Sequence, residues 1–291
     1  MKCINKRFVR VCSLLLVCSL CTISGTGCGE NRLEDAFEAD LPGIGIQTSE
    51  ESSKIPYFAS DLCVTDTDVQ DIEADTEDAL AACFFNLSEK KVLYAKNIHE
   101  RMYPASTTKI MTALVALDKG DLDAQTTVSK EAITFSESGV STAKLKEGDV
   151  LTLRQLLYAL LTVSANDAAN VIAEQIAGSQ DAFVEMMNQE AQKIGATNTH
   201  FVNANGLHSE DHYTTVYDLY LMFNAAMQHE EFLQMLQEKE YQASYQAADG
   251  TTVEAVWSTT NQFTKGDVTV PDGVTAVGGK TGTTTAAMSC L

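Results

Sequence analysis

Ser106 and Lys109 form a Ser-x-x-Lys motif whose spacing suits nucleophilic catalysis. On a helix, side chains three residues apart lie on one face, so the Lys109 amine can reach the Ser106 hydroxyl. Serine becomes a good nucleophile only when a base removes its proton. An amine can be that base if burial or a nearby cation lowers its pKa towards neutrality. Ser106 at the start of a helix would also place backbone N–H groups beside a developing oxyanion.

Two further motifs offer groups that would complete such a site. Ser164-Ala165-Asn166 stands at a predicted break between two helices, where a hydroxyl and a carboxamide can both point into a cleft. Lys280-Thr281-Gly282-Thr283 follows two glycines on a predicted strand, whose free edge can pair with an extended peptide. Lys280 would supply a cation that lowers the pKa of Lys109 and attracts a carboxylate. Each motif is weak alone, but the three together indicate one catalytic site.

The elements that must position these motifs follow from hydrophobic periodicity and from turn and cap signals. A hairpin is predicted first, then a helix that opens at Ser106 and stops at Gly120. Thr152 with Gln155, and Thr215 with Asp218, are capping patterns that open two later helices. The predicted strands are 81–87, 92–95, 251–257, 268–270 and 276–283, and the later helices are 152–163, 166–177, 181–193 and 216–227. This order predicts one α+β domain, with the middle helices packed against or beside a sheet.

Length and charge exclude several classes of protein. The chain has 291 residues, of which 45% are hydrophobic, so it can bury a sizeable core. Asp and Glu number 40 against 20 Lys and Arg, which gives a formal net charge of −20. Binding to nucleic acid needs a cationic surface, so a uniformly basic nucleic-acid binder is excluded. Attraction to anionic lipid is disfavoured for the same reason.

The N-terminal residues read as a secretory signal peptide, residues 1–27. Basic residues precede the apolar run 11–23, and small residues follow it. Cleavage before Cys28 leaves two alternatives open, a lipid anchor on Cys28 or simple secretion. In either case the protein is expected outside the cytoplasm, secreted or tethered to a membrane at the cell wall. Membrane contact is expected only through that anchor.

Residues 28–78 are rich in Asp and Glu and have no clear periodicity. Low hydrophobicity with like charge predicts a solvated, mostly disordered linker, although the apolar patch 55–64 could dock onto the domain. Residues 79–291 are predicted to form the catalytic domain. No Cys-x-x-Cys occurs, and Cys83 and Cys290 are expected to be free buried thiols in strand-like runs.

With these motifs in view, the chain resembles the serine D-alanyl-D-alanine carboxypeptidases, the low-molecular-mass penicillin-binding proteins. The resemblance covers about residues 80–291. The segments on which it rests, in the order found in the family, include PASTTKIMTALVAL, LTLRQLLYALLTVSANDAANVIAE, FVNANGLH and GGKTGTT. The middle residue of Ser-x-Asn, usually Gly in this family, is Ala165 here.

The resemblance implies a β-lactamase/transpeptidase-like α+β fold, in which an antiparallel sheet has flanking helices and a helical subdomain. It implies acyl transfer through an ester on Ser106, which removes the terminal D-alanine of peptidoglycan stem peptides, and acylation of Ser106 by β-lactams. Lys109 would be the base and Ser164 the proton relay. The substrate would be bound by Asn166, Lys280, Thr281, Gly282 and Thr283, with backbone N–H groups of Ser106 and Thr283 as the oxyanion hole. No metal or cofactor is implied.

Three alternatives stay open. A class A-like β-lactamase shares two of the motifs, but it needs a Glu that activates the deacylating water, and no Glu-x-x-Leu-Asn follows Ser164. A zinc peptidase could use His208, Asp211 and His212, although no His-Glu-x-x-His occurs. A catalytically impaired wall-binding fragment is the third. The family continues with further sheet strands after Lys-Thr-Gly, whereas this chain stops at Leu291, so we expect a truncated domain of low stability or weak activity.

Overall fold

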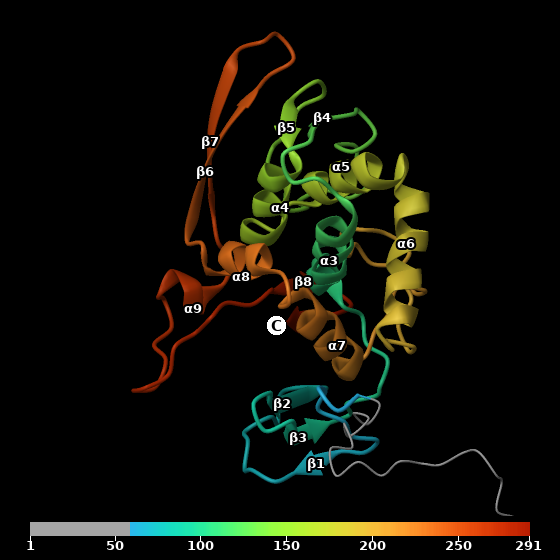
Figure 1. Cartoon of the computed structure of the whole chain (residues 1–291), viewed down its shortest axis with the longest axis vertical. Helices are drawn as coiled ribbons and strands as arrows, with labels where there is room; N and C mark the ends of the chain where they lie inside the picture. The colour runs from blue at the N-terminus through green and yellow to red at the C-terminus, as the bar shows by residue number, and fades with distance from the viewer. Residues whose placement is uncertain (1–58) are drawn as a thin grey trace, which may run out of the picture. The chain divides into compact units, whose positions relative to one another are not determined.

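The structure is a computed structural model that describes residues 59–291 (Figure 1). The predicted signal peptide and Cys28 lie outside the described residues. Residues 59–291 form one compact unit. Among residues 59–291, none of the helices has the length and apolar composition of a membrane-spanning segment.

Helices make up the middle of the unit and strands lie before and after them. The helices are the 3₁₀ helix η1 (Ala105–Thr108) and α3 (Lys109–Lys119), α4 (Leu153–Thr162), α5 (Asn166–Ala177), α6 (Gln180–Lys193), α7 (Val216–Ala226), α8 (Glu230–Gln237) and α9 (Gln262–Lys265). The strands are β1 (Val69–Gln70), β2 (Ala82–Asn86), β3 (Lys91–Lys96), β4 (Gln125–Thr127), β5 (Val150–Thr152), β6 (Glu240–Gln246), β7 (Thr252–Ser258), β8 (Gly282–Thr284) and β9 (Met288–Cys290).

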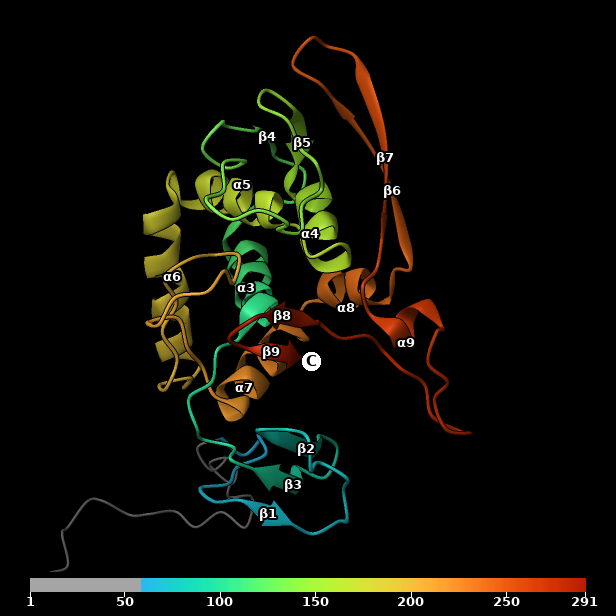
Figure 2. The ribbon, with the colours of Figure 1, turned by 180° about the vertical axis from the view of Figure 1, so that it is seen from behind.

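The strands form three antiparallel sheets, with orders β1-β3-β2, β4-β5-β6-β7 and β8-β9. The long β6–β7 hairpin extends beyond the helices in both views (Figures 1 and 2). Antiparallel sheets with flanking helices confirm the predicted α+β fold class. The predicted hairpin near the N-terminus is also confirmed, as β2 and β3.

Helix α3 is the centre of the core. It is apolar on nearly every side, and its residues from Lys109 to Ala116 are buried. A helix with this composition must be surrounded by other elements. Helices α4, α5, α6 and α7 all contact it (Figure 2). The first turn of α3, which carries Lys109, is therefore held in place from several directions.

Local cap chemistry fixes the neighbouring helices as the sequence predicts. Thr152 and Gln155 form a complete capping box at the start of α4. Gly178 ends α5 in the left-handed conformation, which a glycine adopts without a Cβ penalty. The Thr215 side chain accepts the Asp218 N–H at the start of α7.

The structure differs from the predicted linker boundary at residue 79. Strand β1 lies before it and pairs with β3. Cys63 is fully buried, and its N–H donates to the Tyr220 hydroxyl at 2.9 Å. The predicted linker therefore includes ordered residues, which pack because a few apolar side chains dock onto the domain despite the acidic surroundings. This agrees with the expectation that the patch 55–64 could dock, as far as its described residues show.

Two of the predicted late strands are wrong or shorter than predicted. Residues 268–270 form no strand, and the strand predicted over 276–283 begins only at Gly282. Val268, Val274 and Val277 are exposed. β-branched residues favour a strand only where a partner and a packing surface exist, and this segment has neither among the described residues.

The cysteines agree with the expected free thiols. Cys83 and Cys290 are unpaired and partly buried, and burial raises the pKa of Cys83 to about 12. Cys63, the third described cysteine, is also unpaired.

Candidate active site

Ser106 lies in a tight turn that is closed by a residue in an uncommon conformation. Ala105 has a φ of +47°, in the left-handed region that non-glycine residues rarely adopt. The Thr107 side chain and N–H both donate to the Pro104 carbonyl, at 2.6 and 3.1 Å. Strain of this kind persists only where the surroundings enforce it, and it is concentrated at functional sites. The turn leaves Ser106 half-buried at the start of the helical segment.

Lys109 is fully buried one turn after Ser106, and its Nζ lies 3.0 Å from Ser106 Oγ. Its other partners are the side-chain oxygen of Asn166, at 2.7 Å, and the main-chain carbonyl of Asn205. Burial holds the pKa of Lys109 well below its usual range, and the charge of Lys280 lowers it further. The amine is therefore neutral at a much lower pH than an exposed lysine.

The contacts of a neutral Lys109 orient its lone pair. A neutral amine has two N–H bonds and one lone pair. The two oxygens of Asn166 and Asn205 can only accept, so they take the two N–H bonds. The lone pair then faces Ser106 Oγ and can take the hydroxyl proton. This arrangement fits a general base for serine.

Ser164 and Asn166 lie where α4 ends and α5 begins, as the sequence predicts. Ser164 has a φ of +57°, so the site contains a second left-handed residue that is not glycine. The Ser164 hydroxyl accepts from Lys280 Nζ at 2.9 Å, while Asn166 accepts from Lys109. The Ser-Ala-Asn turn therefore joins the two lysines, because each one bonds to a different member of it.

Lys280 and Thr281 immediately precede β8. Lys280 is 2% exposed, and its Nζ also donates to the Thr281 carbonyl at 2.6 Å. Burial lowers the pKa of Lys280 to about 7. Its charge is therefore present only in part at neutral pH, which the sequence-based view of Lys280 as a fixed cation did not include.

Gly282 brings β8 directly against the Ser106 turn. An added Cβ at this position would lie 2.8 Å from Ser106 N and 3.1 Å from Thr107 N. Only glycine allows this approach without a shift of the backbone. Thr283 follows on β8 with an exposed side chain. The structure thus gathers all the predicted site residues of the three motifs around Ser106, whereas Cys28 lies outside the described part of the chain.

The loop between α6 and α7 contributes residues that the motif search missed. Asn205 supplies the carbonyl that accepts from Lys109, and its side chain donates to Asn170 at 3.0 Å. Gly206 has a φ of +84°, and an added Cβ would lie 2.0 Å from the Ala105 carbonyl oxygen. The segment FVNANGLH carries part of the family resemblance, but no residue type in it indicates a main-chain contact to the base.

His212 is buried beneath the same turn. Its Nδ1 accepts the Val202 N–H at 3.1 Å, so its Nε2 carries the proton and donates to Thr108 Oγ1 at 2.7 Å. Burial lowers the pKa of His212 to about 4. With both ring nitrogens engaged, His212 has no lone pair for a zinc ion, which argues against the zinc peptidase alternative. In residues 59–291 no three His, Cys, Asp or Glu side chains are grouped to hold a metal ion.

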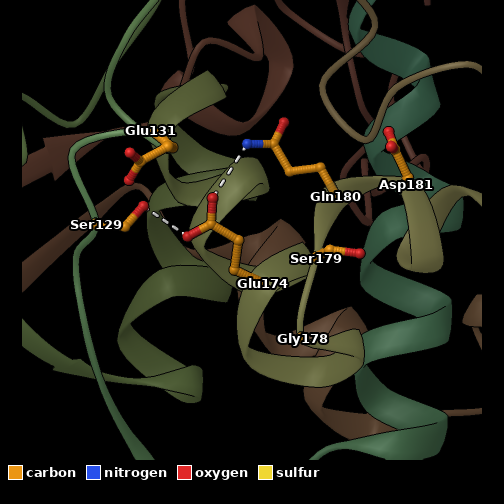
Figure 3. Close-up of a pocket in the computed structure, with 7 residues that line it drawn as sticks. All are labelled: Ser129, Glu131, Glu174, Gly178, Ser179, Gln180 and Asp181. Carbon is orange, nitrogen blue, oxygen red and sulfur yellow. Dashed lines mark hydrogen bonds between the residues drawn. The ribbon is translucent and has the colours of Figure 1, made fainter.

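A pocket of about 340 Å³ lies apart from this site, between α5, the start of α6 and the segment after β4 (Figure 3). Glu174 is its central residue, two turns of α5 beyond Asn166, and accepts hydrogen bonds from Ser129 and Gln180. The pocket contains no residue of the three motifs.

Comparison with known proteins agrees with this geometry. A family model described as D-alanyl-D-alanine carboxypeptidase matches residues 68–291. D-alanyl-D-alanine carboxypeptidase DacF of Bacillus subtilis is 38% identical over 156 residues, which are 53% of this chain. The match covers only 40% of DacF, so the chain spans about two-fifths of that relative's length.

Streptomyces sp. K15 provides a relative in sequence and in structure. Its D-alanyl-D-alanine carboxypeptidase is 35% identical over 210 residues, which cover 68% of this chain and 70% of that protein. The crystal structure of the Streptomyces K15 DD-transpeptidase superposes with a TM-score of 0.67 at 31% identity, over 78% of this chain and 86% of that one. The family match, the identity and the shared fold lead to one conclusion: the chain belongs to the D-alanyl-D-alanine carboxypeptidase family.

Proposed function

We propose that this protein is a serine-type D-Ala-D-Ala carboxypeptidase that removes the terminal D-alanine of peptidoglycan pentapeptides through an acyl-enzyme on Ser106. The observation that carries the proposal is the buried Lys109 amine, 3.0 Å from Ser106 Oγ, with a pKa well below its usual range. A serine with an unperturbed lysine could not be activated at neutral pH. The family and the named relatives support the substrate class.

In the acylation step Lys109 takes the Ser106 proton as Oγ attacks the carbonyl carbon of the penultimate D-Ala. A C–O bond forms, and the carbonyl oxygen becomes an oxyanion. The backbone N–H groups of Ser106 and Thr283 are proposed to stabilise it, since β8 adjoins the Ser106 turn. Asn166 holds the Lys109 amine with its oxygen, which leaves its NH₂ to donate to a substrate carbonyl.

Collapse of the intermediate breaks the C–N bond and releases D-alanine. The leaving nitrogen takes a proton from the Ser164 hydroxyl, which regains one from Lys280 Nζ at 2.9 Å. The proton that Lys109 took from Ser106 then restores Lys280, so that Lys109 is neutral again. Water then attacks the Ser106 ester, with Lys109 again as base, and frees the shortened peptide. Lys280 and Thr281 are proposed to recognise the terminal carboxylate.

β-Lactams would acylate Ser106 by the same attack, because they resemble the D-Ala-D-Ala end. In residues 59–291 no Glu carboxylate is hydrogen-bonded to Ser106, Lys109, Ser164 or Asn166. A class A-like β-lactamase needs such a group to activate the deacylating water. The geometry therefore favours a slowly released β-lactam adduct over rapid turnover.

The proposed substrate sets the location. Peptidoglycan lies outside the cytoplasmic membrane, so the protein must work there, at the cell wall. Attachment through a lipid on Cys28 remains a proposal, and it would keep the domain near this substrate.

Mass spectrometry after incubation with benzylpenicillin tests the proposal. We expect one covalent adduct, on the peptide that contains Ser106, and release of D-alanine from a pentapeptide. Ser106→Ala should lose both, whereas Ser138→Ala, which changes an exposed loop residue, should keep both. Ser106→Cys, a variant of nearly native volume, controls for folding: its thermal melt shows whether replacement of Ser106 leaves the fold intact. An adduct elsewhere, or D-alanine release by folded Ser106→Ala, would refute the assignment.

A further inference from the structure

Thr260 is an exposed residue in a turn beside the candidate active site. Its neighbours Thr259 and Asn261 are only 5% and 3% exposed. The Thr260 N–H donates to the Thr162 carbonyl at 3.0 Å, at the end of α4 and two residues before Ser164. Asn261 Nδ2 donates to the Gly279 carbonyl at 3.3 Å. The turn is thus attached to the segments that carry Ser164 and Lys280.

The Thr260 hydroxyl meets the hydroxyl of Thr281. The two Oγ1 atoms are 3.0 Å apart in an exposed position. Lys280, by contrast, is directed inwards, with its Nζ bonded to Ser164 Oγ and to the Thr281 carbonyl. Of Lys280 and Thr281, the two residues expected to meet a substrate carboxylate, Thr281 is therefore the one whose side chain is presented to solvent, and the Thr260 hydroxyl lies beside it.

We propose that Thr260 is a second hydroxyl donor for the terminal carboxylate of the substrate, paired with Thr281. The inference rests on the proposed function and names a further specificity-determining residue for the same site. In the free protein one hydroxyl donates to the other, so only one proton of the pair faces outwards. A carboxylate has two acceptor oxygens, and it can turn both hydroxyls outwards as donors.

This pairing makes Thr260 a reader of the free carboxylate. A hydrogen bond to a charged group is lost when the hydroxyl is removed, whereas a neutral C-terminal amide gains little from it. Removing the hydroxyl should therefore lower kcat/KM for the free acid by roughly 10- to 100-fold and leave the amide nearly unaffected. A purely structural role for Thr260 would lower the two rates together.

Steady-state kinetics on diacetyl-L-Lys-D-Ala-D-Ala and on its C-terminal amide tests the inference. Thr260→Val keeps the side-chain shape and removes the hydroxyl, whereas Thr260→Ser keeps the hydroxyl. We expect Thr260→Val to lower the ratio of acid to amide activity at least tenfold and Thr260→Ser to preserve it, with an exposed control, Thr252→Val on β7, unchanged.

An unchanged ratio in Thr260→Val would overturn the inference, whether the two activities stay native or fall by the same factor. If the unmodified protein releases D-alanine and Thr260→Val behaves like it, only the role of Thr260 fails. If the unmodified protein neither releases D-alanine nor forms the Ser106 adduct, the proposed function fails, and the role of Thr260 falls with it.

Discussion

Protonation of His212 should destabilise this protein between pH 7 and pH 4 by an amount that the structure sets. In the fold, His212 is 2% exposed and accepts the Val202 N–H on Nδ1. A proton on Nδ1 would face that N–H, so two donors would oppose each other. His200, Lys109 and His208 add positive charge nearby. Burial in the first place, and these charges in the second, lower the pKa of His212 from 6.5 to about 4.

The sign and size of this change in unfolding free energy follow from the linkage between proton binding and folding. The folded pKa lies below the unfolded value, so the stabilising contribution is complete above pH 6.5 and is lost as the pH falls towards 4. The loss in unfolding free energy is about 2 kcal/mol at pH 5 and about 3 kcal/mol at pH 4, relative to pH 7.5. Buried Asp218, whose pKa is raised by burial, changes stability with pH in the opposite sense. A comparison between variants is therefore required.

His212→Asn provides that comparison. Asn has an oxygen near the position of Nδ1 that can still accept the Val202 N–H, and it does not titrate. Urea unfolding of both proteins at pH 7.5, 5 and 4 gives the difference in unfolding free energy. We expect His212→Asn to be less stable at pH 7.5, because the bond to Thr108 is lost, and the difference to shrink by about 3 kcal/mol at pH 4. A difference that stays constant with pH would refute the neutral, buried state assigned to His212.

Two further predictions concern the backbone that supports the site. Gly206→Ala should lower the unfolding free energy by at least about 2 kcal/mol, because a Cβ at φ +84° would collide with the Ala105 carbonyl. It should also abolish labelling of Ser106 by fluorescent penicillin. Native labelling would show that the loop is not held against the turn that carries Ser106. Thr152→Ala should lower the unfolding free energy by about 1 kcal/mol, measured by urea denaturation, through loss of the capping box. Its labelling rate should be unchanged, and slower labelling would mean that α4 transmits strain to Ser164.

Interactions between residues close together in the sequence could be predicted, and those between residues far apart in the sequence could not. The i, i+3 spacing of Ser106 and Lys109 and the capping box of Thr152 are local, so the sequence pattern determines them. The contact of Lys109 with Asn205 uses a main-chain carbonyl, which every residue has. No residue type at position 205 could have indicated it, because only the tertiary fold brings that carbonyl to the amine.

The errors have a similar cause. Strand β1 has two residues, too few for any periodicity, and its pairing with β3 defines it. Val268 lies in a run of β-branched residues, yet it remains outside any strand because no described segment pairs with it. Thr260 carries no motif, and its interest comes from a hydroxyl that lies 3.0 Å from Thr281.

The way in which β8 is held should make the protein lose activity at a lower temperature than the one at which its helical core unfolds. The segment 268–281 has neither helix nor strand, and β8 pairs only with β9 among the described strands. Small sheets joined by irregular chain open at lower free energy than a helical core. Warming the protein would then withdraw Lys280 and Gly282 from Ser106 while α3 and its neighbours stay folded. Catalysis would cease in a molecule whose circular dichroism is still that of the native state.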